Sequence, residues 1–461
     1  MRYAPKCNVR DGIQRLRNEC SVLKIAVKDF GKIANAEVQL SPLMLLVGKN
    51  NTGKSYLATL IWAMSNLGAL LQTDHAKETR PAWFSEFVDA PEKPRQLTIT
   101  AEMMADVASH VNHLFAEAGG AFLANTFAFD GFSETQLSIA NSEDFPSVEI
   151  SIATAEEAGN DRPRGYTEVQ FSVEGQRVLL LRYQALVLRS TAWTMRVYGD
   201  LVGLAFFGKE WMSYRTPLYI PAARTGLMLA LRSLVSQSLE LDNEPPAQTL
   251  PRPLASFLQR MSYPSGRPRD QELLDWFTKD VAHGHLERSG ESEFPDFSYK
   301  PENSSITLPL YATSSMITEV APFMIAIGDH RVLRYIVFEE PEAHLHLAAQ
   351  RSMARAIARL VAMGVKVVVT THSDTFVQQI NNLMQLYGHR RRDALLERFG
   401  YEKNDLIDPS TVSAYEFVDR DGKTSVTKLA STTGGFVVNS LNETLISLAE
   451  ETVLLQEDVD D

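Results

Sequence analysis

Residues 48–55 combine small, polar and basic residue types at a spacing that suits phosphate binding. The segment reads Gly48, Lys49, Asn50, Asn51, Thr52, Gly53, Lys54 and Ser55. Glycines let the backbone curl so that successive N–H groups point at phosphate oxygens, and a following helix adds a favourable dipole. Lys54 would reach the β- and γ-phosphates, and the Ser55 hydroxyl would bind Mg²⁺. The pattern predicts a nucleotide site; the alternative is a Gly-rich loop that only caps a helix.

Carboxylates and a histidine follow two other apolar runs. Residues 335–338 are Tyr-Ile-Val-Phe, and Glu339 and Glu340 come directly after them. At a strand end, Glu339 can hold Mg²⁺, directly or through water, and Glu340 can polarise an attacking water. His372 directly follows the β-branched run 367–371. A histidine at the tip of a strand can contact a γ-phosphate. The alternative is a solvated acidic turn, and the phosphate-type loop favours the catalytic interpretation.

Buried strands and crossover helices are needed to position these residues. Leu43–Val47 is a continuous apolar run that ends at the Gly-rich loop, as expected for a strand buried on both faces. The pattern also predicts strands over 22–27, 36–40, 333–338 and 366–370, and helices over 54–67, 345–363 and 373–386, the last capped by Ser373. Strands that alternate with helices indicate a parallel sheet.

The middle of the chain, from about 75 to 305, has another pattern. Residues 148–152 and 169–173 alternate between apolar and polar, which predicts half-buried antiparallel strands. The segments 179–204 and 225–239 are expected to be helical, and the prolines from Pro245 to Pro253 to form a stiff connector. Towards the C-terminus the pattern predicts strands over 412–417 and 425–429 and a helix over 438–455.

Composition narrows the class of protein. Of the 461 residues, 44% are hydrophobic, which excludes a mostly disordered chain. The net charge of −12 disfavours unaided, non-specific binding to nucleic acid. Two cysteines, Cys7 and Cys20, exclude a disulfide framework and a four-cysteine zinc site. Without a long apolar run or a signal-peptide pattern, the expectation is a soluble cytoplasmic protein with no membrane partner.

Together the motifs resemble the ABC-type ATPase heads of the SMC, RecF and OLD class. GKNNTGKS looks like their Walker A motif, YIVFEEPEAHLH like Walker B and the D-loop, and VVVTTHS like the switch-histidine strand. ATSSMITEVAP, residues 312–322, resembles their degenerate signature segment, and LYIPAARTG, residues 218–226, recurs among compact OLD-like ATPases. The resemblance covers about 22–70 and 305–450. It implies an α/β fold, an SMC-like P-loop ATPase head with a mixed sheet, an antiparallel β portion and a helical insertion.

The resemblance also implies a division of the chain and a mechanism with two subunits. Residues 1–75 would form an N-terminal ATPase lobe, 76–304 an insertion, and 305–461 a C-terminal ATPase lobe. Two such heads would enclose two ATP molecules, and Ser314 or Ser315 would contact the γ-phosphate bound by the opposite subunit. The remaining expected site residues follow from the motifs: Glu340, His372 and Lys54 as catalytic residues, Gly48 to Ser55 as the nucleotide loop, and Ser55 and Glu339 as Mg²⁺ ligands.

Three residues depart from the pattern of these relatives. Glu339 stands where most ABC proteins have Asp, Met316 follows Ser315 where a Gly-Gly pair is usual, and Leu347 stands where many relatives have Pro. The missing glycines predict slow hydrolysis. No glutamine of the chain is assigned to the Q-loop.

The chain resembles compact stand-alone defence ATPases, such as the AriA-like subunits of PARIS systems and the Septu and retron-associated ATPases. That resemblance implies a sensor or scaffold that controls a separate toxin or nuclease in bacterial anti-phage defence. Too few residues follow Ser373 for a Toprim nuclease of ordinary domain size. One alternative is a RecF-like clamp that acts on DNA. Another is a structural module that binds a nucleotide without hydrolysing it. Glu340 argues against this alternative, because a binding module has no need of a second carboxylate.

Weaker features have two interpretations each. His344 and His346 suit a D-loop better than a metal site. His110 and His113 are expected to be a solvated or packed pair on a helix. Arg224 is either a phosphate or interface arginine or a member of a structural ion pair.

Overall fold

The computed structural model describes most of the chain. The described residues are 23–65, 67–71, 73–89, 94–141, 147–157, 164–184, 192–207, 217–231, 250–262, 271–289, 296–329, 333–432 and 434–457. Cys7, Cys20, Pro245 and the end of the helix expected over 225–239 lie outside these residues; 224–231 are helical.

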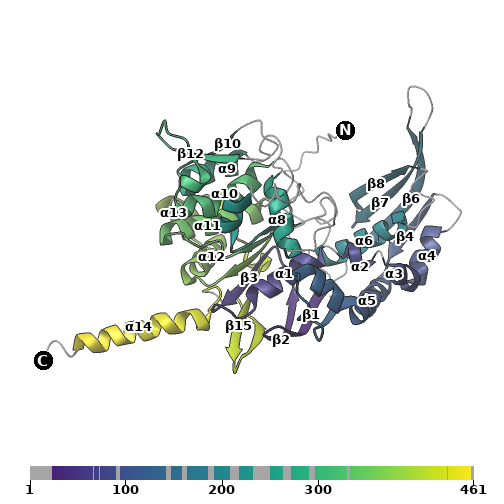
Figure 1. Cartoon of the computed structure of the whole chain (residues 1–461), viewed down its shortest axis with the longest axis horizontal. Coiled ribbons are helices and arrows are strands. Elements are labelled where there is room, and N and C mark those ends of the chain that lie inside the picture. Colours follow the sequence, from purple (N-terminus) through teal and green to yellow (C-terminus); the bar gives the residue numbers. More distant parts are fainter. Residues whose placement is uncertain are drawn as a thin grey trace.

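A nine-stranded mixed sheet forms the centre of the molecule (Figure 1). Its strands, in spatial order, are β5 (Gln136–Asn141), β1 (Leu23–Phe30), β2 (Ile33–Gln39), β16 (Lys423–Lys428), β15 (Val412–Arg420), β3 (Leu43–Gly48), β14 (Lys366–Thr371), β13 (Tyr335–Glu339) and β9 (Leu218–Ile220). From β15 to β9 every neighbouring pair is parallel, whereas β5, β1 and β2 pair antiparallel. The fold is therefore mixed α/β with a large mixed sheet, as predicted.

Helices cover both faces of this sheet. They are α1 (Lys54–Met64), α8 (Arg252–Ser262), α9 (Gln271–Phe277), α10 (Ser315–Gly328), α11 (Leu347–Ala362), α12 (Asp374–Tyr387) and α13 (Arg392–Phe399). Helix α14 (Asn439–Glu457) instead projects away from the sheet towards the C-terminus (Figure 1). Met44 and Leu46 of β3 face one hydrophobic core with α1, while Leu43, Leu45 and Val47 face a second core with α8 to α12. Every residue of β3, β13 and β14 is buried between these two cores. Strands covered on both faces need apolar side chains on both, which explains their nearly continuous apolar runs.

A second sheet is antiparallel and lies to one side of the first (Figure 1). It contains β4 (Arg95–Ile99), β6 (Val148–Glu157), β7 (Arg164–Val173) and β8 (Gln176–Gln184). The helices α2 (Gly68–Leu71), α3 (Asp74–Thr79), α4 (Ala82–Asp89), α5 (Ala101–Phe127) and α6 (Ala192–Phe207) accompany it. We call these strands and helices the insertion subdomain. The antiparallel strands predicted around 150 and 171 are confirmed.

One predicted helix in this region is wrong. Residues 179–184 belong to strand β8, and α6 begins only at Ala192. Strand β8 pairs with β7 across a two-residue turn, Glu174 and Gly175, whose φ angles are 50° and 76°. Positive φ at both turn residues matches the twist of a hairpin. Pairing with β7 therefore decides the structure of the leucine run, although its apolar pattern also suits a helix.

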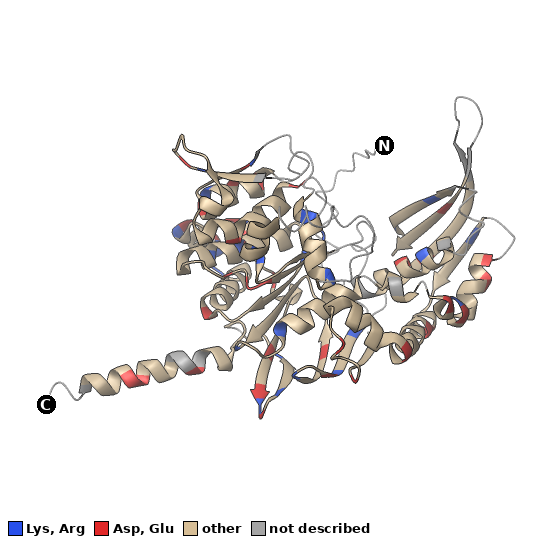
Figure 2. Cartoon of the chain, in the orientation of Figure 1, with Lys and Arg blue, Asp and Glu red and all other residues tan. Residues whose placement is uncertain are grey.

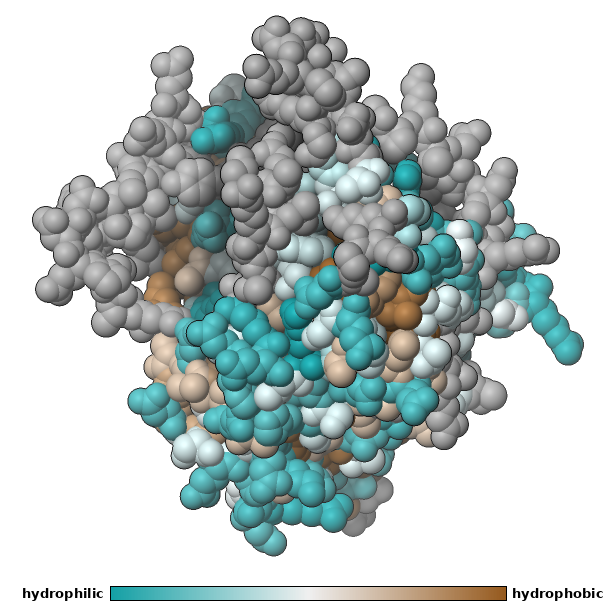
Figure 3. Space-filling view, turned by 90° about the vertical axis from the view of Figure 1, so that its right-hand side faces the viewer, coloured by the Kyte–Doolittle hydropathy of each residue, from teal (hydrophilic) through white to brown (hydrophobic). Residues whose placement is uncertain are grey.

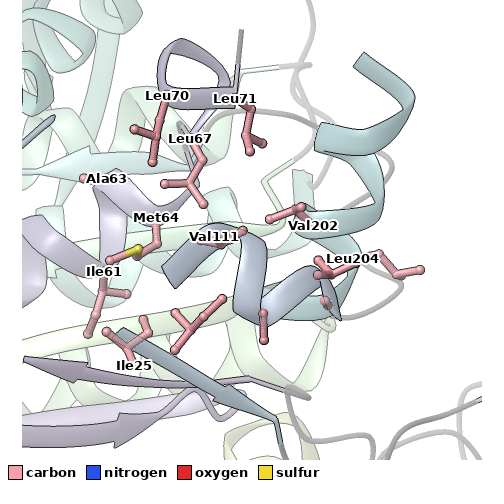
Figure 4. Packing of buried hydrophobic residues seen from close by; sticks show 14 of the residues in the cluster. Ile25, Ile61, Ala63, Met64, Leu67, Leu70, Leu71, Val111, Val202 and Leu204 are labelled. Carbon is pink, nitrogen blue, oxygen red and sulfur yellow. The ribbon is translucent and has the colours of Figure 1, made fainter. Parts of the chain in front are cut away.

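The insertion subdomain shares its hydrophobic core with the central sheet. Figure 4 shows Ile25 of β1, Met64 of α1, Leu70 of α2, Val111 of α5 and Val202 of α6 in one buried cluster. In addition, β5 and β9 come from the 76–304 segment and form the two edges of the central sheet. The division of the chain at residues 75 and 304 stays a prediction.

Smaller elements complete the described chain. A three-stranded sheet contains β10 (Gly284–Ser289), β11 (Asp296–Pro301) and β12 (Leu308–Pro309). Short helical turns span Thr278–Ala282, Leu310–Ala312, Lys403–Asp405 and Pro409–Thr411. The predicted C-terminal strands and helix are confirmed as β15, β16 and α14, and the Ser373 side chain caps α12 as expected. Among the described helices, none combines the length and the hydropathy that a membrane span requires.

Candidate nucleotide-binding site

The Gly-rich loop joins β3 to α1, and two of its glycines occupy positions that a side chain could not fill. Gly48 has φ of 148°, and a Cβ there would lie 2.6 Å from the Phe417 carbonyl oxygen. Gly53 has φ of 93° at the N-terminus of α1, and its Cβ would lie 2.9 Å from Ile33 Cγ1. The loop can therefore approach β15 and β2 closely only with glycine at these positions.

Lys54 places its ammonium group within the curve of this loop. The side chain is 6% exposed, and Nζ donates to the carbonyl oxygens of Gly48 and Lys49 at 2.9 and 2.7 Å. Burial lowers the pKa of Lys54, while the carboxylates of Glu340, Glu342 and Glu339 act in the opposite direction. A cation with weak carbonyl partners can exchange them for phosphate oxygens, which bind it more strongly.

The other loop residues lie around this lysine. Thr52 is buried, and its hydroxyl donates to the Lys49 carbonyl at 2.9 Å. The side chains that face solvent are Lys49, Asn50, Asn51 and Ser55. An open outer face leaves room for a nucleotide and for a further protein surface.

Three parallel strands bring their carboxyl ends to the same edge as this loop. In the register, Glu339 of β13 pairs with Thr370 of β14, and Thr371 pairs with Val47 of β3. Glu339 is 6% exposed; its Oε2 accepts a hydrogen bond from the Ala222 N–H at 3.0 Å, and its Oε1 is buried without a hydrogen-bond partner. A buried carboxylate oxygen that lacks a donor fits a hydrated divalent cation.

Glu340 and His372 face each other beside Glu339. Glu340 has φ of 42°, and its N–H donates to the Thr370 carbonyl at 2.9 Å. Glu340 Oε1 lies 3.5 Å from His372 Nδ1. As a hydrogen-bond donor, His372 lowers the pKa of Glu340, and the same contact raises the pKa of His372. Glu340 is therefore held as a carboxylate, the form that can accept a proton from water.

Glu342 supports His372, a role that sequence reasoning missed. This carboxylate is 3% exposed; its Oε1 accepts hydrogen bonds from the Thr371 hydroxyl at 2.6 Å and from the His372 N–H at 3.0 Å. Burial raises the pKa of Glu342. Glu342 thus fixes the backbone that carries the histidine. The acidic run EEPE contained the signal, but only the fold shows that its last carboxylate points towards β14.

Arg224 is a member of a structural ion pair, the second of the two interpretations left open. It is 1% exposed, and its Nε lies 2.6 Å from Glu319 Oε2. The guanidinium also donates to the main-chain carbonyls of Glu339 and Glu340, each at 2.9 Å. Arg224 therefore holds the backbone that presents both carboxylates and ties it to helix α10.

The two signature serines lie on a different element. Ser314 caps α10, where its Oγ accepts from the Ile317 N–H at 3.4 Å, and Ser315 is the first residue of that helix. Both are exposed. Helix α10 packs on α8, α9 and β10, whereas α1 packs on β3, β13 and β14. The structure thus brings Lys54, Glu339, Glu340 and His372 together, and it places the serines at the start of α10. The roles of all these residues stay predictions.

Parts of the chain are similar to known proteins. Residues 22–119 and 315–377 match the family model of an AAA ATPase domain. No curated protein matches the chain. The chain is similar to an Smc head bound to the C-terminal winged-helix domain of ScpA, with 13% identity over 89% of this chain and 98% of that chain and a TM-score of 0.37.

Two further solved structures are of the same kind. One is an Smc head domain with an extended coiled coil, bound to the C-terminal domain of ScpA, from Pyrococcus furiosus, with 12% identity over 94% of this chain and 100% of that chain and a TM-score of 0.32. The other is the SMC head domain from Thermotoga maritima, with 10% identity over 89% and 99% of the two chains and a TM-score of 0.30. The segments that match the family model contain the Gly-rich loop, both carboxylates and His372, so the similarity to an AAA ATPase domain covers the candidate site.

Proposed function

We propose that the chain binds ATP with Mg²⁺ at the carboxyl edge of β3, β14 and β13 and hydrolyses it. The observation that carries the proposal is the convergence of Lys54, Glu339 and Glu340 there. A cation, a carboxylate with an unpartnered oxygen and an ionised carboxylate beside a histidine are the groups that phosphoryl transfer to water requires.

Each group has one task in this reaction. Lys54 would leave the carbonyls of Gly48 and Lys49 and bind the β- and γ-phosphates. Ser55 and Glu339 would hold Mg²⁺, which neutralises charge on these phosphates. Glu340 would accept a proton from the water whose oxygen bonds to the γ-phosphorus, while the bond to the ADP oxygen breaks. ADP, phosphate and a proton result.

His372 would detect the γ-phosphate. Its Nδ1 lies between the carboxylates of Glu340 and Glu342, at 3.5 and 3.7 Å, and its side chain is 40% exposed. A histidine that is partly open to solvent can donate to a phosphate oxygen while Glu342 fixes its main chain. Loss of the γ-phosphate would then return it to Glu340.

We also propose that two chains pair head to head around two ATP molecules. Asn50 and Asn51 are exposed on one side of the loop, where Lys49 pairs with Glu443 of α14 at 3.3 Å. Ser314 and Ser315 are exposed at the N-terminus of a 14-residue helix. Hydroxyls and free N–H groups at such a position suit an anionic partner. In the pair, each α10 would face the γ-phosphate held by the other chain.

The biological role that fits best is a sensor or scaffold that controls a separate toxin or nuclease in anti-phage defence. The support is the motif resemblance to compact defence ATPases. The net charge of −12 also favours a protein effector over DNA. Figure 2 shows Lys and Arg on many of the described elements, with Asp and Glu among them.

The test compares wild-type protein with Glu340→Gln in the presence of Mg²⁺ and ATP. We expect Glu340→Gln to bind ATP, to release phosphate at least about a hundredfold more slowly, and to accumulate as a dimer in sedimentation experiments. Glu397→Gln, an exposed change on α13, is the matched control and should behave like wild type. Hydrolysis by Glu340→Gln at the wild-type rate would refute the assigned role of Glu340.

The effector proposal is tested with the same variant, tagged and expressed from its native locus. A protein that copurifies stoichiometrically with ATP and dissociates without it would support a scaffold. Nucleic acid retained without a protein partner would refute the scaffold and indicate the RecF-like clamp.

A further inference from the structure

Two histidines and a glutamate from two helices converge on the insertion subdomain. His75 lies on α3, and His113 and Glu117 lie one turn apart on α5. His75 Nε2 is 2.6 Å from Glu117 Oε2 and 3.3 Å from His113 Nε2, and His113 Nε2 is 3.4 Å from Glu117 Oε1. The side chains are 43%, 50% and 46% exposed, in that order. Two imidazole nitrogens and the Glu117 carboxylate thus lie around one point that solvent can reach.

Hydrogen bonds alone satisfy this arrangement poorly. If both histidines donated from Nε2 to Glu117, two N–H groups would face each other at 3.3 Å. If only one donated, the other Nε2 would turn its lone pair towards a carboxylate. A cation at the centre removes both conflicts, because neutral imidazole nitrogens and a carboxylate oxygen all present lone pairs to it.

The spacing of the donors fits a tetrahedral ion. Donors about 2.0–2.1 Å from a tetrahedral metal lie about 3.3 Å apart. The two imidazole nitrogens, 3.3 Å apart, have this separation. The Glu117 contacts involve two different oxygens, Oε2 at 2.6 Å from His75 Nε2 and Oε1 at 3.4 Å from His113 Nε2, so a rotation of the carboxylate would bring one oxygen onto the ion. Imidazole suits zinc and similar transition ions, whereas Mg²⁺ and Ca²⁺ prefer oxygen ligands.

The helices that carry the donors are held in place by a second, buried contact. His110 Nε2 lies 3.2 Å from the Thr79 hydroxyl of α3, and His110 Nδ1 lies 2.8 Å from the Tyr198 hydroxyl of α6. The Thr79 hydroxyl also donates to the His75 carbonyl at 2.8 Å. The backbone of His75 is therefore fixed relative to α5, so the donors are positioned before a metal arrives.

We propose that His75, His113 and Glu117 bind one Zn²⁺ ion, with water in the remaining position, and that the ion clips α3 to α5. Figure 3 views the molecule from the side of the insertion subdomain, where the described surface mixes hydrophilic and hydrophobic residues. Water can reach the three side chains, because each is more than 40% exposed. The proposed site shares no residue with the nucleotide site, and it stands or fails independently of the proposed function.

Zinc titration calorimetry of the full chain, freed of metal and without nucleotide, tests this site. Cys7 and Cys20 are changed to Ser in every sample, because thiolates also bind zinc. We expect one Zn²⁺ per chain. His113→Ala and His75→Ala should each weaken binding by about a hundredfold or more, and Glu117→Gln should weaken it less. Zinc should raise the thermal midpoint of the parent protein and leave that of His113→Ala unchanged.

His285→Ala is the matched control, because His285 is an exposed histidine on β10. It should bind zinc like the parent protein. The three donor side chains are exposed, so the variants should keep the parent's circular dichroism spectrum. Absence of saturable binding at one ion per chain, or equal affinity in the His75→Ala/His113→Ala double variant, would overturn the proposal.

Discussion

The nucleotide edge of the central sheet and the core of the insertion subdomain bury polar groups in opposite ways. At the edge, three ionisable side chains, those of Lys54, Glu339 and Glu342, are each 6% exposed or less. In the subdomain, His110 is 5% exposed and bonds to the hydroxyls of Tyr198 and Thr79. Burying a charge costs far more than burying a paired neutral group. The buried charges of Lys54 and Glu339 lie where phosphate and a cation are proposed to bind, whereas His110 is buried as a paired neutral group.

The environments of two histidines, His372 and His110, show the same difference. His372 faces the carboxylates of Glu340 and Glu342, and its pKa is raised. Burial lowers the pKa of His110 to about 4, so it is neutral at physiological pH. One histidine is arranged to carry a charge and the other to avoid one. The predictions below test whether this contrast governs activity and stability.

The largest effect is expected at Lys54. Lys54→Ala should abolish detectable ATP binding and lower kcat/KM by at least about a thousandfold, because the phosphates lose their buried cation. Lys77→Ala removes a partly exposed lysine of the insertion subdomain that pairs with Asp74, and it should leave both quantities unchanged. Nucleotide affinity by fluorescence titration and phosphate release measure the two effects. Equal nucleotide affinity in wild type and Lys54→Ala would contradict the Walker A assignment.

Arg224 should matter next, through stability and through kcat. Arg224→Met leaves the Glu319 carboxylate buried without its partner, which should cost about 3–5 kcal/mol in the free energy of unfolding. Arg182→Ala in the subdomain breaks the exposed pair with Glu168 and should cost about 1 kcal/mol or less. Urea denaturation measures both.

A conservative variant separates positioning by Arg224 from its contribution to folding. Arg224→Lys keeps the charge but cannot reach Glu319 and both strand-end carbonyls at once. It should lower kcat more than it raises KM for ATP. Equal changes in the two parameters would argue against a positioning role.

His110 should make stability rise with pH. Its folded pKa of about 4 lies below the unfolded value of 6.5, so the unfolded chain binds more protons between these two values. The free energy of unfolding should therefore increase from pH 4 to pH 6.5, by up to about 3 kcal/mol from this group. The difference between wild type and His110→Gln, measured by denaturation across this range, isolates the effect. A difference that does not vary with pH would refute it.

His110 also shows how far sequence reasoning reaches. The Gly-rich loop, its strand and its helix are contiguous, so residues 43–64 could be predicted with their geometry. The meeting of Glu339 with that loop followed from the rule that parallel strands end at one edge. His110 forms a hydrogen bond with Tyr198, which is 88 positions away, and no local sequence pattern predicts such a partner. The same is true of Arg224, whose contacts are mainly with Glu319 and with main-chain carbonyls on β13.

The smallest effect is expected at His372, and its sign is opposite to that of His110. The folded pKa of His372 lies above the unfolded value of 6.5, so its stabilising contribution is complete below pH 6.5 and is lost as the pH rises through the folded pKa. The side chain is 40% exposed, so solvent screening should limit the contribution to well under about 1 kcal/mol. His372→Gln should therefore destabilise the nucleotide-free chain more at pH 6 than at pH 9, as measured by thermal midpoints. If the destabilisation grew with pH, the imidazole would be held neutral like that of His110, and the contrast between the two regions would fail.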